Sequence, residues 1–150
     1  MQSYTKLLFH VVFGTRDRVE LLTPAMRPRL IAYIGGTIAK TSGVLLCGQA
    51  MPEHVHLFIS LNATANIAGA VRDMKANSSR WLKETFPALG RSFAWQSGYG
   101  AFSVSHSLRE AVRKYIETQE RHHEKRSFRD EYLGFLDRHG IEYNPRTVFA

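Results

Sequence analysis

Hydrophobic and polar residues recur along the chain with two periods, one typical of strands and the other typical of helices. Aromatic and β-branched residues predict four strands, at residues 4–13, 43–50, 54–61 and 93–104. Only residues 51–53 separate the second and third strands, so we expect these two to be antiparallel. Ser97 and Gly98 interrupt the pattern of the fourth strand.

Helical spacing predicts four helices, which begin and end at about residues 23–42, 65–86, 107–123 and 127–138. Thr23 followed by Pro24 is typical of a helix start. This first helix should bury one face, formed by Met26, Leu30, Ile34 and Ile38. Ser107 and Glu110 have the spacing of a capping box, which predicts the start of the third helix.

The order of these elements predicts an α+β fold with a ferredoxin-like or RRM-like antiparallel sheet, helices packed on one face, and a C-terminal helix and tail. The length of 150 residues suits a single domain, residues 1–150, with a core at 1–123 and a C-terminal extension at 124–150. A fold of this kind hosts many functions, so the function must be argued from particular residues.

The chain is basic, with a formal net charge of +7 and a pI of about 9.9. This charge favours anionic partners, which include nucleic acid, membrane surfaces and acidic proteins. No apolar run approaches the length of about 20 residues that a membrane-spanning helix needs, and the first residues lack the features of a secretory signal. We therefore expect a cytoplasmic protein without membrane partners. The single cysteine, Cys47, lies in an apolar run and is interpreted as a buried, inert thiol.

The first candidate for chemistry is the pair His54 and His56. Residues two apart on a strand point to the same face, so the two imidazoles should lie side by side while Val55 points into the other layer. Two histidines in this arrangement supply two thirds of a metal site. Either histidine could equally be a surface or hydrogen-bonded core residue, so the pair alone is a weak signal.

The second candidate is Tyr115 with Gln119, four residues apart on one face of the third predicted helix. The ordinary interpretation of each is a packing tyrosine and a solvated glutamine. Neither residue indicates a function alone.

Four motifs that follow one another in order carry a resemblance: Met51–Phe58, Lys75–Arg80, Trp95–Tyr99 and Tyr115–Gln119. Over roughly residues 4–123 the chain resembles the single-tyrosine HUH transposases of the smallest bacterial insertion sequences, together with their domesticated relatives that act on repeated palindromes. The resemblance implies that His54, His56 and Gln119 bind a divalent metal and that Tyr115 is the nucleophile. It also implies a single-stranded or hairpin DNA substrate and a homodimer, with the tyrosine of one subunit reaching the histidines of the other. Glu53 stands where the family commonly has an aspartate.

The chemistry of these residue types agrees with the resemblance. Two imidazole nitrogens and an amide oxygen suit Mg²⁺ or Mn²⁺, and the nitrogens favour Mn²⁺, although Zn²⁺ is a further possibility. A nearby cation stabilises a phenolate and polarises a scissile phosphate. Attack by Tyr115 would give a 5′-phosphotyrosine, which conserves the phosphodiester bond energy and allows another strand to be joined without ATP.

DNA contacts are expected from basic residues in two places. On the second predicted helix, Arg72, Lys75 and Ser79 recur at three- and four-residue spacing, and Arg80 borders this stripe. Arg16 and Arg18, in the loop after the first strand, form the second candidate patch. Phosphate binding and a merely solvated basic face are both compatible with the stripe. By the resemblance, Trp95 and Tyr99 could stack on bases, with at least one of them packed in the core.

Two other functions fit parts of this pattern. One is a domesticated relative that performs the same strand chemistry on repeated palindromes, for which the extension at residues 124–150 is the reason. The other is a non-enzymatic RNA-binding module, since a ferredoxin-like sheet can present aromatic side chains to bases. The motifs of that module are missing from the first and third strands, and a requirement for divalent metal would distinguish an enzyme from a binding module.

Overall fold

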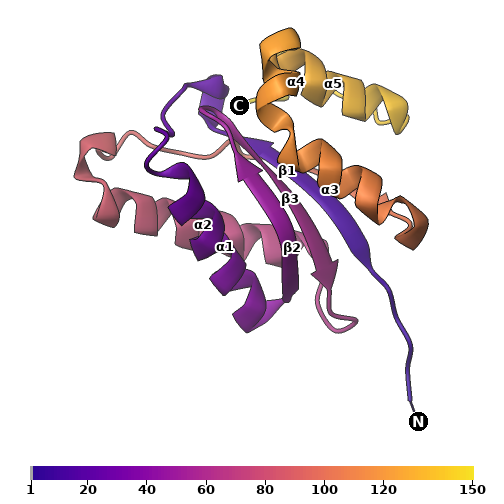
Figure 1. Cartoon of the computed structure of the whole chain (residues 1–150). Helices are drawn as coiled ribbons and strands as arrows, with labels where there is room; N and C mark the ends of the chain where they lie inside the picture. The colour runs from indigo at the N-terminus through magenta and orange to yellow at the C-terminus, as the bar shows by residue number, and fades with distance from the viewer. Residues whose placement is uncertain (1) are drawn as a thin grey trace.

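A computed structural model describes residues 2–150 as a four-stranded antiparallel sheet with helices on both of its faces (Figure 1). The strands are β1 (Leu8–Gly14), β2 (Gly43–Ala50), β3 (His54–Leu61) and β4 (Gly100–Val104). They are arranged in the order β2-β3-β1-β4, and every neighbouring pair is antiparallel. This order confirms the predicted α+β, ferredoxin-like class.

Helices α1 (Arg27–Thr41) and α2 (Ile67–Thr85) cover one face of the sheet. The predicted apolar stripe of α1 is confirmed, because Met26, Leu30, Ile34 and Ile38 are all buried in the main core. The sheet contributes five buried side chains to this core: Val11, Phe13, Val55, Leu57 and Ile59. Asn66 caps α2 by accepting a hydrogen bond from the Gly69 amide at 2.7 Å.

Helices α3 (Arg109–Glu117), α4 (Gln119–Lys125) and α5 (Phe128–Arg138) lie across the opposite face (Figure 1). The predicted one-sided packing therefore describes α1 and α2, and the later helices form a second layer. Val12 and Phe102 of the sheet pack with Phe128, Tyr132 and Phe135 of α5. Strand β3 is consequently buried on both sides, which encloses the face that carries its two histidines.

The fourth strand is shorter than predicted, because only residues 100–104 join the sheet. Trp95 forms an isolated bridge with Thr15, and its indole Nε1 donates to Ser78 Oγ at 3.0 Å. The Lys75 ammonium donates to the carbonyl oxygens of Gln96 and Gly98, at 2.8 and 2.5 Å. These side-chain contacts hold residues 95–98 against α2, so the segment does not pair as a continuous strand.

The third predicted helix is in fact two helices that meet at Thr118. Its backbone leaves helical geometry, at φ −105° and ψ 24°, and its hydroxyl donates to the Lys114 carbonyl at 2.8 Å. A threonine hydroxyl competes in this way with the backbone pattern of a helix. Ser107 is not the predicted cap, since its hydroxyl contacts Ser105 Oγ and α3 begins only at Arg109.

The C-terminal segment folds back onto the sheet layer. Ser127 caps α5 by accepting from the Asp130 amide at 3.1 Å. Phe149 is buried against Phe128, and the Ala150 carbonyl accepts from the Ser97 amide at 2.7 Å. None of the helices described within residues 2–150 combines the length and the apolar character that spanning a membrane requires.

Two glycines should respond in opposite ways to substitution by alanine. Gly43 has φ +156°, and an added Cβ would overlap the Ser60 carbonyl oxygen of the neighbouring strand. Gly43→Ala is expected to lower the free energy of unfolding by about 1–3 kcal/mol. Gly36 lies within α1 with open space around it, so Gly36→Ala should raise the free energy of unfolding by about 0.5–1 kcal/mol. Urea denaturation measures both, and an unaffected Gly43→Ala variant would contradict the pairing of β2 with β3 at this position.

Candidate active site

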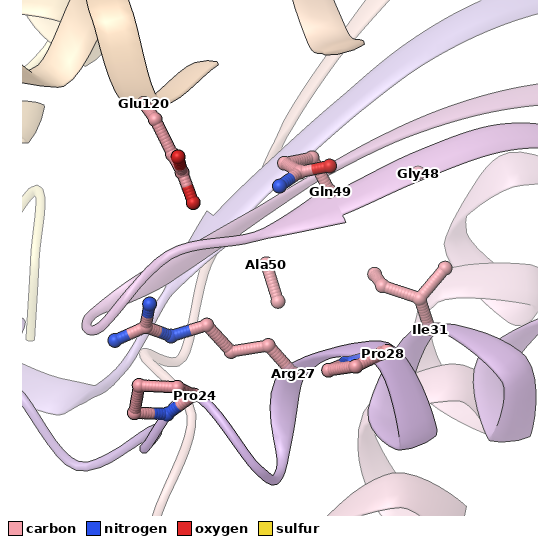
Figure 2. A pocket seen from close by; sticks show the side chains of 8 residues that line it. All are labelled: Pro24, Arg27, Pro28, Ile31, Gly48, Gln49, Ala50 and Glu120. Carbon is pink, nitrogen blue, oxygen red and sulfur yellow. The ribbon is translucent and has the colours of Figure 1, made fainter. Parts of the chain in front are cut away.

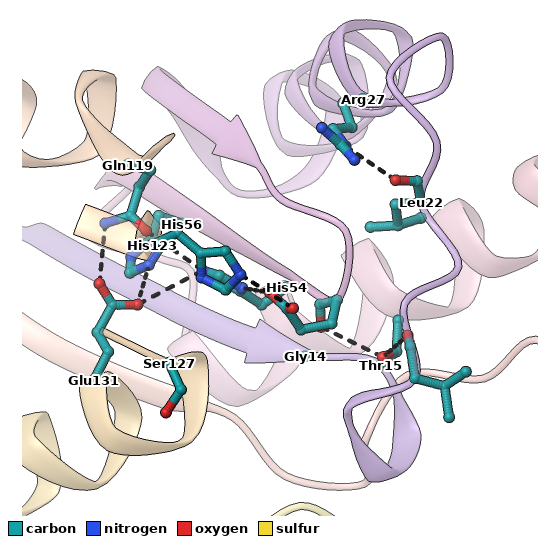
Figure 3. Close-up of polar contacts among 12 residues, drawn as sticks. Gly14, Thr15, Leu22, Arg27, His54, His56, Gln119, His123, Ser127 and Glu131 are labelled. Carbon is teal, nitrogen blue, oxygen red and sulfur yellow. Dashed lines mark hydrogen bonds and ion pairs between the residues drawn. The ribbon is translucent and has the colours of Figure 1, made fainter. Parts of the chain in front are cut away.

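His54 and His56 lie side by side on β3, as predicted, with ring centroids 5.0 Å apart and no solvent exposure (Figure 3). Their side chains face α3–α5, whereas Val55 points into the core beneath α1 and α2. The Phe128 ring stacks on His54 with a centroid distance of 4.1 Å. Gly14, opposite His54 on β1, makes room for this ring, because a Cβ there would lie 2.6 Å from it.

Glu53 orients His54. Its Oε1 atom lies 2.5 Å from His54 Nδ1, so the ring donates its Nδ1 hydrogen to the carboxylate and directs Nε2 inward. Glu53 Oε2 also contacts His123 Nε2 at 3.4 Å. Burial opposes the charge of Glu53, but the hydrogen bond from His54 outweighs this effect and holds the pKa of the carboxyl below its usual value.

His56 is held between a third histidine and a carboxylate. Its Nδ1 lies 2.7 Å from His10 Nε2, and its Nε2 lies 2.9 Å from Glu131 Oε1. Burial lowers the pKa of both His10 and His56, so both rings are neutral at pH 7. In one tautomer His56 donates its Nε2 hydrogen to Glu131 and His10 donates to His56 Nδ1; in the other, His56 Nδ1 donates to His10 and Nε2 is left with a lone pair. His10, a residue that the sequence analysis did not single out, thus helps to fix the orientation of His56.

Tyr115 and Gln119 reach the histidines from α3 and α4, although a break at Thr118 separates them. The Tyr115 hydroxyl donates to Glu131 Oε2, and Gln119 Nε2 donates to the same oxygen at 3.1 Å. Gln119 Oε1 faces His54 Nε2 at 3.4 Å. The four residues that the sequence singled out therefore lie together within one chain.

The Tyr115 phenol is half-buried, and its ring stacks on His122 with a centroid distance of 4.5 Å. Burial raises the pKa of Tyr115 well above its usual value, and its hydrogen bond to the negative Glu131 raises it further. The phenol is therefore protonated at neutral pH. His122 and His123 diverge from α4, the first onto Tyr115 and the second onto Glu53, as neighbouring residues on a helix should.

Glu131 is the central residue that sequence reasoning missed. Its carboxylate contacts His54, His56, Tyr115 and Gln119, yet it lies on α5 and outside every recognised motif. Burial opposes its charge, but the hydrogen bonds from His56 and Tyr115 keep the pKa of Glu131 far below its usual value. The one sequence signal was an acidic residue on the helix face that also carries Phe128, Tyr132 and Phe135.

The donor atoms at the centre of this site suit a divalent cation. In the tautomer of His54 that donates its Nδ1 hydrogen to Glu53, Nε2 presents a lone pair. That lone pair faces two further acceptors, Gln119 Oε1 at 3.4 Å and Glu131 Oε1 at 3.6 Å. Acceptors that converge without a hydrogen between them repel one another unless a cation lies among them. A set of imidazole nitrogens with amide and carboxylate oxygens fits Mn²⁺ or Mg²⁺.

The residues predicted to bind DNA lie in different surroundings. Arg72, Arg80 and Arg16 are exposed, Ser79 is partly exposed, and Lys75 is committed to the carbonyls of Gln96 and Gly98. Burial lowers the pKa of Lys75 to about 8. Because α2 and the histidines lie on opposite faces of the sheet, the α2 stripe is not next to the active site (Figure 1). Trp95 packs in the core between Phe13 and Phe93, while Tyr99 stays partly exposed.

A hollow of about 480 Å³ adjoins the histidine pair at Glu53 and His123. Its lining carries four basic residues, Arg18, Lys125, Arg126 and Arg129, beside three glutamates, Glu20, Glu53 and Glu124. These side chains, unlike the α2 stripe, lie next to the histidine pair.

Another hollow, of about 420 Å³, lies between the start of α1, the end of β2 and Glu120 (Figure 2). Nε of Arg27, which lines this hollow, donates a hydrogen bond to the Leu22 carbonyl at 2.9 Å. Its lining brings together one carboxylate and one guanidinium, without a cluster of metal-ligating groups among the described residues. We therefore place the chemistry at the histidine pair.

Known proteins are similar to this chain in sequence and in fold. The ISDra2 transposase TnpA of Deinococcus radiodurans is 26% identical over 118 residues, which cover 76% of this chain and 84% of that protein. A solved protein of Deinococcus radiodurans R1, described as a candidate transposase, has a TM-score of 0.66 at 24% identity and covers 79% of this chain and 95% of its own. A REP-associated tyrosine transposase bound to a REP hairpin has a TM-score of 0.59 at 20% identity, with coverages of 82% and 72%.

The family described as "Transposase IS200 like" matches residues 3–119, which are most of the chain and include the histidine pair, Tyr115 and Gln119. The family resemblance found in the sequence is thereby confirmed. This chain belongs to the IS200-like transposase family.

Proposed function

We propose that this chain cleaves and rejoins single-stranded DNA through a 5′-phosphotyrosine formed on Tyr115, with a divalent metal held by His54, His56 and Gln119. One observation carries the proposal: the Tyr115 hydroxyl and His56 Nε2 contact the same carboxylate, and Gln119 lies against His54, all within one chain. Membership of a transposase family supplies the class of reaction, which is cleavage and transfer of DNA strands.

The proposed cleavage forms one bond and breaks one. The Tyr115 oxygen attacks the scissile phosphorus, the bond from phosphorus to the 3′-oxygen breaks, and that oxygen leaves as a 3′-hydroxyl after taking up a proton. The phenol proton has an acceptor already in contact, Glu131 Oε2. A bound Mg²⁺ or Mn²⁺ would polarise the phosphate and offset the charge that builds during attack. A 3′-hydroxyl from another strand reverses these steps and joins the DNA.

Hairpin DNA is the proposed substrate. The REP-associated tyrosine transposase of similar fold binds a REP hairpin. In this chain, Arg18, Lys125, Arg126 and Arg129 line a hollow beside the histidine pair, and they are proposed to contact phosphates of the strand that enters the active site. Arg16, Arg72, Ser79 and Arg80 are proposed to contact the hairpin elsewhere, and Lys75 is proposed to act on DNA only by holding residues 96–98 in place.

The homodimer expected from the resemblance is proposed as an assembly of two complete sites. Tyr115 meets the histidines of its own chain, so a second subunit is not needed to supply the nucleophile. This arrangement differs from the exchange of tyrosines between subunits that the resemblance implied.

A second candidate is the same chemistry performed on repeated palindromes by a domesticated relative. The observation in its favour concerns the residues beyond 119, which lie outside the family match. One of them, Glu131, contacts His56 in the candidate active site. Cleavage of hairpins taken from repeated palindromes, in preference to hairpins from the ends of a mobile element, would support this candidate.

Replacing Tyr115 by phenylalanine should abolish covalent attachment to DNA. Incubation with single-stranded hairpin DNA and Mn²⁺ should give an adduct that survives a denaturing gel, and Tyr115→Phe should give none while it still binds the hairpin. Tyr99→Phe is the matched control, because Tyr99 lies beside Lys75 on the α2 side of the sheet and should keep the adduct. An adduct that persists in Tyr115→Phe would move the nucleophile to another residue.

The proposed metal ligands should differ in how much cleavage depends on them. His54→Ala removes an imidazole that Glu53 orients, and the rate of cleavage should fall by more than about 100-fold. Gln119→Ala removes a weaker amide ligand, and the rate should fall by about 10- to 100-fold. Rates measured at several Mn²⁺ concentrations test this order, and wild-type cleavage by His54→Ala would contradict the assignment.

Basic residues beside the active site should contribute to DNA binding through phosphates. Arg129→Ala should weaken hairpin binding and reduce the slope of log K against log salt by about 1. Lys40→Ala, an exposed change of the same charge at the far end of α1, is the control and should leave both unchanged. Fluorescence anisotropy over a salt series provides the slopes, and equal slopes for Arg129→Ala and the wild type would exclude a phosphate contact.

A further inference from the structure

Glu131 occupies a position that neither the family match nor the proposed ligand set explains. The match ends at residue 119, whereas Glu131 lies in the first turn of α5. Only 4% of its surface is exposed, although an ionised carboxylate normally requires water or a cation. A residue that is charged and buried at the centre of a proposed active site needs a physical reason to be there.

Neither lysine nor arginine forms an ion pair with Glu131 in the part of the chain that the structure describes. Within the described residues 2–150, its ion-pair distances are to His54 and His56 alone. Each histidine also has a second partner for its ring hydrogens: His54 Nδ1 contacts Glu53, and His56 Nδ1 contacts His10. Hydrogen bonds from Tyr115 and Gln119 orient the carboxylate but do not neutralise it. A negative charge in this setting is costly until a cation arrives.

The spacing of the donor atoms suits such a cation. Glu131 Oε1 lies 2.9 Å from His56 Nε2 and 3.6 Å from His54 Nε2, and the three atoms lie within 4.8 Å of one another. Neighbouring ligands of an octahedral cation with bonds of about 2.1 Å lie about 3 Å apart. The 3.6 Å separation is too long for a hydrogen bond, but it is compatible with two ligands of one ion.

We propose that Glu131 is itself a ligand of the divalent cation, together with His54 and His56, so that α5 completes the metal centre of this chain. The inference rests on the metal site of the proposed function and adds a fourth ligand from the C-terminal segment. Glu131 Oε1 binds the ion, while Oε2 keeps its hydrogen bonds to Tyr115 and Gln119 and thereby positions the nucleophile beside the metal.

The opposite role for Glu131 would be a plug that the cation must displace. Displacement requires the carboxylate to find another place, yet its neighbours on the inward face of α5 are the apolar rings of Phe128, Tyr132 and Phe135. Moving Glu131 out would also break its bonds to Tyr115 and Gln119. The carboxylate therefore stays, and the ion binds to it.

Isothermal titration of the full chain with MnCl₂, without DNA, tests this role. Glu131→Gln keeps the shape of the side chain but removes its charge, and it should weaken Mn²⁺ binding at least about tenfold. Glu131→Asp restores a carboxylate and should recover part of the affinity. Asp130→Asn is the matched control, since it removes the same charge from an exposed neighbour on α5 and should bind Mn²⁺ as the wild type does.

The outcomes separate this inference from the proposed function. Wild-type or tighter Mn²⁺ binding by Glu131→Gln, with binding lost in His54→Ala, overturns the role of Glu131 as a ligand and identifies it as a plug. Undiminished Mn²⁺ binding by His54→Ala overturns the proposed metal site itself. Circular dichroism without Mn²⁺ verifies that each variant is folded, and if Glu131→Gln is not, Glu131→Asp decides: affinity equal to or above that of the wild type overturns the inference.

Discussion

A buried histidine must find a partner for each of its two ring nitrogens, and His54 and His56 impose this requirement on elements from the whole length of the chain. Glu53, the preceding residue, contacts Nδ1 of His54, and His10 on β1 contacts Nδ1 of His56. The two inward nitrogens face Gln119 and Glu131, from α4 and α5. The second layer of helices therefore does more than cover the sheet, because it supplies the polar groups without which two imidazoles could not be buried.

The same requirement connects folding to chemistry. Glu53 accepts the Nδ1 hydrogen of His54, and His10 can accept the Nδ1 hydrogen of His56, which leaves on each ring the inward Nε2 lone pair that a metal ion needs. Glu131 holds the Tyr115 phenol at the centre, while burial and the nearby negative charge keep that phenol protonated. In our account the nucleophile is thus positioned before DNA binds but is not yet reactive, and an arriving cation and phosphate change its electrostatic surroundings.

The parts of the site that local spacing determines could be predicted from the sequence. Alternation along β3 placed His54 and His56 on one face, and a four-residue interval brought Tyr115 and Gln119 to the same side despite the break at Thr118. The roles of His10 and Glu131 depend on strand register and on how α5 crosses the sheet, and no short-range pattern encodes either. The fold class followed from the order of the elements. The second helix layer was not foreseen, because the periodicity of a helix does not show which face of a sheet it will cover.

The most direct test of the central claim is the position of Mn²⁺ in crystals of the protein, located by anomalous scattering. The account predicts a peak about 2.2 Å from the Nε2 atoms of His54 and His56, with Tyr115 of the same chain beside it. A peak between Glu53 and His123, or a partner subunit's tyrosine in place of the chain's own, would contradict it.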